Sequence, residues 1–166
     1  MKSVIKKLSL LLLLSCMTSV YALDKQTVQM ARINGLLKEG MNRSVTYLDA
    51  DDRFLPFVFL LGTNMVNREA FYSDEKAYES EGAYKEAVND LMNTAAGAAG
   101  QKVIEGFVLF AHTNSKVGGK SAQGISVLIE SEGVVPRQLF YSYSKVDGEL
   151  KVANPIEMTY EGVLFK

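Results

Sequence analysis

Apolar residues recur every three or four positions in two stretches of the chain, which is the spacing of a helix with one buried face. The first stretch follows Asp24, a good helix-capping residue, and predicts a helix that runs to about Leu48. The second stretch opens at Ser73 or Ser80 and predicts a helix that ends near Gly100. Small residues fill the last turns of the second helix, so we expect it to lie close to a sheet.

The rest of the pattern is typical of strands. Residues 54–61 are almost continuously apolar, and residues 65–71 follow a Gly-Thr-Asn turn, which predicts a hairpin between the two helices. An Asp-Gly pair at 147–148 predicts a tight hairpin turn near the C-terminus. Alternating apolar and polar positions predict further strands, at residues 103–111, 122–130, 138–145 and 150–153, with a last short pair at 156–160 and 162–165.

The predicted order of elements is α-β-β-α-β-β-β(-β). It lacks the regular alternation of strands and helices that a parallel nucleotide-binding sheet requires. We therefore predict an α+β fold with a single antiparallel sheet of about five to seven strands, and with the two helices packed on one face of it.

The first 22 residues have the layout of a bacterial secretory signal. Lys2, Lys6 and Lys7 form a basic start, a short leucine-rich run follows, and Ala22 is a small residue at the expected cleavage point. The apolar run is shorter than the roughly 20 residues that a transmembrane helix needs. We expect a signal peptide at 1–22, a single domain at 23–166, and a mature protein in the periplasm or secreted, with no transmembrane helix.

The single cysteine, Cys16, lies inside this signal, and two interpretations of it are open. In the first, Cys16 is removed with the signal. In the second, the sequence Leu-Leu-Ser-Cys at 13–16 resembles the lipobox of bacterial lipoproteins, so that Cys16 is lipidated and anchors the protein in the envelope. In both cases the mature fold has no disulfide and no cysteine nucleophile.

The charge of the chain argues against a nucleic-acid partner. When the three lysines of the signal are removed from the 18 basic residues, 15 remain, against 19 acidic residues. A mildly acidic protein lacks the concentrated basic patch that phosphate backbones require.

The acidic residues Asp49, Asp51 and Asp52 follow the first predicted helix and resemble the start of a calcium loop. An EF-hand loop that began at Asp49 would need Gly at position 54 and Glu at position 60, where the chain has Phe54 and Leu60. We therefore predict a polar link between helix and strand and no metal site, with a weak, partly hydrated calcium site as the alternative that stays open.

The sequence Gly-Gly-Lys-Ser at 118–121 resembles the end of a phosphate-binding loop. That motif needs a strand before it and a helix after it, whereas here it lies between two predicted strands. We expect a mobile hairpin loop at 114–120, in which Lys116 and Lys120 offer a contact surface for an acidic partner.

His112 is the only histidine, and it follows a predicted strand, where functional groups often lie. One histidine and no mature cysteine are too few for an ordinary zinc site. A hydrolase could use His112 with a serine, or a carboxylate pair drawn from Glu69, Glu105, Glu130 and Glu132. The chain has no Gly-x-Ser-x-Gly elbow that would support the serine version.

These observations favour an exported envelope protein of non-catalytic binding type, such as an inhibitor, an immunity-type protector or an accessory subunit. We expect its partner to be another protein and expect no cofactor. Two alternatives stay open: a small-molecule or lipid carrier with an apolar pocket, and a periplasmic hydrolase. The candidate binding residues are Asp49, Asp51, Asp52, His112, Lys116 and Lys120.

Overall fold

The computed structural model describes the backbone of residues 2–165 and the side chains of residues 25–165. The predicted cleavage after residue 22 and the predicted lipidation of Cys16 lie outside the residues whose side chains are described, so both stay predictions. Among the described residues, no helix combines the length and the apolar character that crossing a membrane requires.

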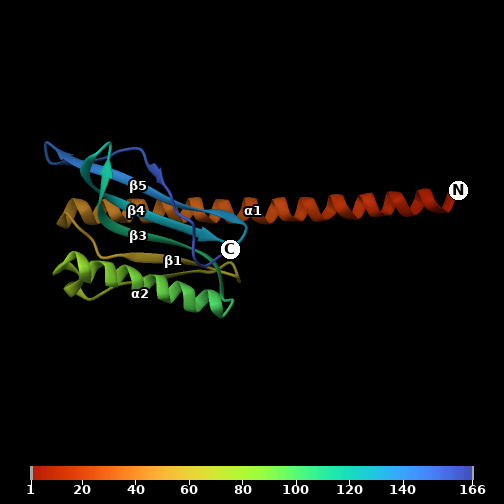
Figure 1. The fold of residues 1–166 in the computed structure, drawn as a ribbon, viewed down its shortest axis with the longest axis horizontal. Helices are drawn as coiled ribbons and strands as arrows, with labels where there is room; N and C mark the ends of the chain where they lie inside the picture. The colour runs from red at the N-terminus through yellow and green to blue at the C-terminus, as the bar shows by residue number, and fades with distance from the viewer. Residues whose placement is uncertain (1, 166) are drawn as a thin grey trace.

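The described chain folds into two α-helices, a short 3₁₀-helix and seven strands (Figure 1). In chain order these are α1 (Lys2–Asp51), β1 (Phe57–Gly62), β2 (Asn67–Phe71), η1 (Glu75–Tyr78), α2 (Glu81–Gly100), β3 (Ile104–Val117), β4 (Lys120–Ser131), β5 (Val134–Val146), β6 (Glu149–Val152) and β7 (Ile156–Met158).

The strands form a single antiparallel sheet in the order β2-β1-β3-β4-β5-β6, and β7 pairs with β5 beside β6. This confirms the predicted α+β class, the single antiparallel sheet and the order of the elements. One row of apolar residues crosses five strands, because Phe71 pairs with Phe57, Phe57 with Phe110, Phe110 with Val127, and Val127 with Leu139.

The predicted placement of both helices on one face needs correction, because they cover opposite faces of the sheet. Phe57 and Phe59 pack in the same cluster as the buried residues of α1, whereas Val58 and Leu60 pack in the cluster of α2. All six residues of β1 are buried, as expected for a strand covered on both sides. We call the two sides of the sheet the α1 face and the α2 face.

A polar network fastens α1 to the sheet. Arg32 forms an ion pair with Glu105 of β3 in which both side chains are only about a tenth exposed, at 10% and 11%. The Arg32 guanidinium also donates to the carbonyl of Gly62 at 3.0 Å. Gln29, which is 3% exposed, donates to the hydroxyl of Ser131. These contacts fix the rotation of α1 about its own axis and its position along the sheet.

The hairpin turns follow their residue types. Asp147 and Gly148 both have positive φ angles, of 56° and 83°, which confirms the predicted tight turn between β5 and β6. Gly118 and Gly119 also have positive φ, 55° and 81°, and they form a two-residue turn between β3 and β4. The predicted mobile loop at 114–120 is therefore wrong, since all but these two residues belong to paired strands.

The C-terminal prediction is only partly confirmed. The predicted strand at 156–160 is present as the shorter β7, but residues 162–165 form no strand.

Candidate functional site

The predicted acidic link is the end of α1. Asp49 and Asp51 lie in its last turn and Asp52 follows it, and all three are exposed. The Asp52 amide donates to the carbonyl of Leu48 at 3.1 Å, and its positive φ of 59° turns the chain out of the helix. The Asp52 carboxylate forms an ion pair with Lys145 of β5. The helix therefore extends three residues beyond the predicted end.

His112 lies close to Asp52, on β3. Its Nε2 atom lies 2.8 Å from the hydroxyl of Tyr143. That hydroxyl also lies 3.3 Å from Oε1 of Gln123 and 3.4 Å from the carbonyl oxygen of Asp52. The ring of His112 also lies against Phe54, with centroids 5.9 Å apart. Burial lowers the pKa of His112 below its usual value.

Tyr84 of α2 closes a gap between two strands at the same end of the sheet. Its hydroxyl accepts a hydrogen bond from the backbone amide of His112 at 2.7 Å and donates to the carbonyl of Phe54 at 3.0 Å. The pairing of β1 with β3 begins only at Phe57, so the phenol replaces the backbone partners that these two groups lack. Burial raises the pKa of the Tyr84 hydroxyl above its usual value.

A hollow of about 470 Å³ opens above these groups, and we call it the polar hollow. Its walls come from the residues just after α1, from η1 and the start of α2, and from strands β3 and β4. It is lined by Asp52, Arg53, Ala77, Tyr78, Ser80, Glu81, Tyr84, Lys85, His112, Thr113, Asn114 and Gln123. Two charged groups on its rim are paired, because Lys85 bonds to Glu81 at 2.7 Å.

A second hollow, of about 260 Å³, adjoins the first through Arg53 and Tyr78, and we call it the aromatic hollow. It is lined by Tyr47, Asp51, Arg53, Phe54, Leu55, Phe71, Tyr72 and Tyr78. The Arg53 guanidinium stacks over the ring of Tyr78, 4.0 Å from its centroid. Two of the aromatic side chains are well exposed, Tyr47 at 41% and Phe71 at 52%.

Asp51, Asp52 and His112 are thus the sequence-predicted residues that the structure brings together around these hollows. Asp49 is exposed on the same helix end but lines neither hollow. Lys116 and Lys120 lie beside the two-glycine turn of the β3–β4 hairpin and line neither hollow. Sequence reasoning missed the aromatic hollow because its rings come from α1, β2 and η1, with no local spacing that links them.

The described residues 25–165 assemble neither the predicted histidine–serine site nor the predicted carboxylate pair of a hydrolase. Within residues 25–165, the hydroxyl bonded to the His112 ring belongs to Tyr143 and not to a serine. Four carboxylates were candidates for an acid–base pair. Glu69 and Glu105 pair with arginines of α1, Glu132 pairs with Lys25, and Glu130 is buried among donors from the end of the chain. The same described residues contain no group of three or more His, Cys, Asp or Glu that could hold a metal ion.

Comparison with known proteins finds no match to this chain among family models, curated proteins or solved structures.

Proposed function

We propose that this chain is an exported protein of the bacterial envelope that acts by binding another protein, without catalysis. The observation that carries the proposal is the composition of the aromatic hollow and its rim. Tyrosine, phenylalanine and arginine are the residues that protein interfaces gather, and tyrosine and arginine are common energetic hot spots. Here Tyr47, Phe71 and Arg53 come together next to a hollow with room for about one side chain of a partner.

The neighbouring edge of the sheet supports the same proposal. Strand β2 is an outer strand, so one side of its backbone is free to meet another chain. Met65 and Val66, just before this strand, are 59% and 56% exposed, and Phe71 at its end is 52% exposed. Such apolar side chains along an open edge favour a protein partner over a small ligand.

The charges around the hollow indicate the kind of partner. Asp49 and Asp51 lie on the end of α1, and Glu75 lies in η1 near Tyr78. Among the described residues that line the aromatic hollow, Arg53 is the one cation and Asp51 the one anion, and Arg43 lies over the ring of Phe71. The exposed carboxylates at the end of α1 therefore offer a contact for a basic group of the partner.

The experiment is affinity capture of the tagged mature protein from envelope extracts, with bound proteins identified by mass. The test variants are Phe71→Ala and Arg53→Ala, and the matched control is Val135→Ala, which truncates a valine that is 78% exposed on β5. We expect a stoichiometric partner that the control retains and that each test variant binds at least about tenfold more weakly.

A partner that binds all three variants equally would move the interface to another surface. A reproducible failure of the folded wild-type protein to capture any partner would overturn the binding function, and the search would turn to the carrier and hydrolase alternatives.

A further inference from the structure

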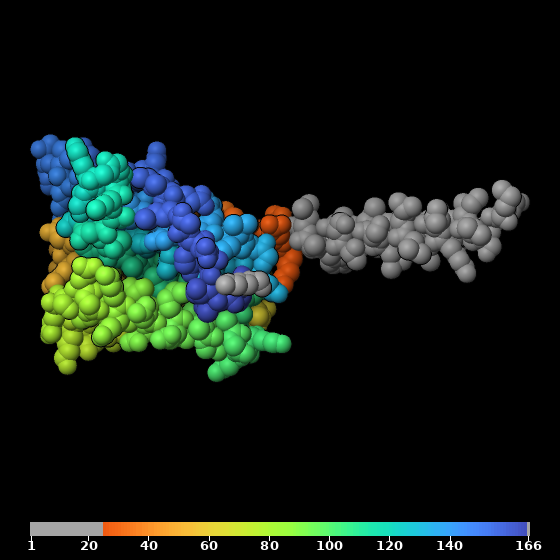
Figure 2. Space-filling model, in the orientation of Figure 1, coloured from red at the N-terminus to blue at the C-terminus, as the bar shows by residue number. Residues whose placement is uncertain are grey.

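The last described residues, 159–165, form no helix or strand, and we call them the strap. In Figure 2 the end of the chain lies against the C-terminal part of α2. Leu164 and Phe165 of the strap pack against the hydrophobic cluster of the α2 face. The strap therefore covers a part of this face beside the helix.

One buried carboxylate holds the strap in place. Glu130 of β4 is only 1% exposed. It accepts hydrogen bonds from the backbone amides of Val163 at 2.9 Å, Leu164 at 2.8 Å and Phe165 at 3.3 Å, and from the hydroxyl of Tyr160. A carboxylate buried to this degree is tolerated only when such donors replace water. All four donors belong to the strap.

Within the described part of the chain, residues 159–165 form no hydrogen bond between backbone groups, and their side-chain bonds to the sheet are those of Glu130. Gly162 lets the strap pass close to the sheet. Its φ of 67° is positive, and a Cβ atom there would lie 2.8 Å from the ring of Pro136. The polar attachment of the whole segment therefore depends on one side chain.

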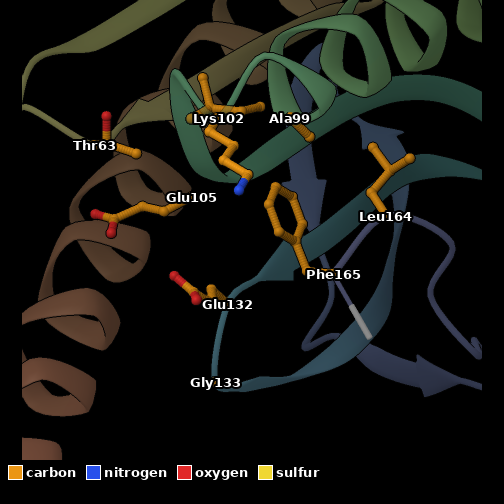
Figure 3. A pocket seen from close by; sticks show the side chains of 9 residues that line it. Thr63, Ala99, Lys102, Glu105, Glu132, Gly133, Leu164 and Phe165 are labelled. Atoms are coloured by element: carbon orange, nitrogen blue, oxygen red, sulfur yellow. The ribbon is translucent and has the colours of Figure 1, made fainter.

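The strap also forms a wall of a third hollow, of about 410 Å³. Figure 3 shows Leu164 and Phe165 on one side of it and Thr63 and Glu105 on the other, with the amino group of Lys102 directed inward. These two apolar side chains close the hollow on the side of the strap.

We propose that Glu130 is the latch of this strap, and that the strap opens as a unit, separately from unfolding of the sheet, and so exposes the side of the hollow that Leu164 and Phe165 close. When the strap lifts, water replaces both the amide donors and the carboxylate acceptor, so no buried group is left unpaired. Such an opening breaks few apolar contacts and no strand pairing. It is therefore more frequent than global unfolding.

The test compares hydrogen exchange in the full chain, the Glu130→Gln variant and the matched control Glu132→Gln, which changes an exposed carboxylate two residues away. In the wild type we expect the amides of 163–165 to exchange faster than those of β3 and β4. Glu130→Gln should speed exchange of the strap amides at least about tenfold and should leave the strand amides within about threefold, because the variant side chain is uncharged and its NH2 group cannot accept hydrogen bonds from the strap amides. The milder Tyr160→Phe should change the strap in the same direction.

A second readout measures access to the hollow. The thiol of an Ala99→Cys variant, placed in the wall beside Lys102, should react with a maleimide faster when Glu130→Gln is also present. Labelling is read peptide by peptide, so that Cys16 does not interfere. If strap and strand amides speed up by the same factor, or the strap amides do not respond, the latch is refuted. An unchanged labelling rate with a faster-exchanging strap would refute the exposure of the hollow.

Discussion

The hydroxyl of Tyr84 gives a sharp test of how this end of the sheet is held together. The change Tyr84→Phe keeps the ring and its packing but removes the atom that joins the amide of His112 to the carbonyl of Phe54. Two backbone groups, part-buried at the point where β1 has not yet paired with β3, then lose their partner.

The expected cost follows from these two bonds. Each is worth about 1 kcal/mol net, and leaving a buried donor unpaired costs a further desolvation penalty of similar size. We expect the free energy of unfolding to fall by about 2–3 kcal/mol, which lowers the melting temperature of a domain of this size by roughly 4–10 °C. The hollow beside His112 should keep its shape, because the phenyl ring stays in place.

Urea unfolding at constant pH measures this change, provided that the slope of the transition is the same for both proteins. Tyr47→Phe is the control, since the Tyr47 side chain is 41% exposed and its hydroxyl forms no hydrogen bond with residues 25–165. The control should shift the free energy by less than about 0.5 kcal/mol. A Tyr84→Phe loss as small as that of the control would refute the bridging role of this hydroxyl.

Three further predictions concern stability. Because burial lowers the pKa of His112, the fold favours the neutral ring, and the free energy of unfolding should fall as the pH drops below about 6.5. His112 is the only histidine, so His112→Gln should flatten this part of the pH profile, which urea unfolding at several pH values measures. Gly40→Ala should destabilise the fold by about 1–3 kcal/mol, because its Cβ would meet a core phenylalanine ring, whereas Gly35→Ala, with open space around it, should stabilise the fold by up to about 1 kcal/mol. Thermal unfolding of the two variants tests both expectations. Arg32→Met should lower the free energy of unfolding by about 3 kcal/mol, because it leaves Glu105 unpaired. Adding Glu105→Gln should restore part of this free energy in denaturant unfolding, and the absence of such a recovery would contradict the argument.

Local patterns predicted most of the architecture. The helical spacing before Leu48, the Asp-Gly turn at 147–148 and the alternation in the later strands each depend on neighbours in sequence, and each is present in the structure. The placement of the helices failed for a different reason. A strand that is apolar at every position needs cover on both faces, and the run at 54–61 carried that signal although the prediction assigned both helices to one side.

The candidate site was less predictable because it depends on tertiary contacts. His112 and Tyr143 meet across β4, at a register that no local pattern specifies. Tyr47 and Phe71 line the same hollow, yet they lie on different elements and each looks like an ordinary amphipathic position. The ends of the β3–β4 hairpin were missed because exposed strand residues there, such as Lys116, carry no apolar alternation.

The division of the core between two faces has a consequence for the growing chain. The apolar side of α1, with Ile33 and Leu48, is completed by residues as distant as Leu139, roughly ninety positions after the helix ends. At the usual rate of roughly 5–20 residues per second, this face stays uncovered for several seconds to some twenty seconds after its synthesis. During that interval the nascent chain exposes an apolar helix face to which a holding chaperone can bind, and the chain stays unfolded until the strands of the sheet pair.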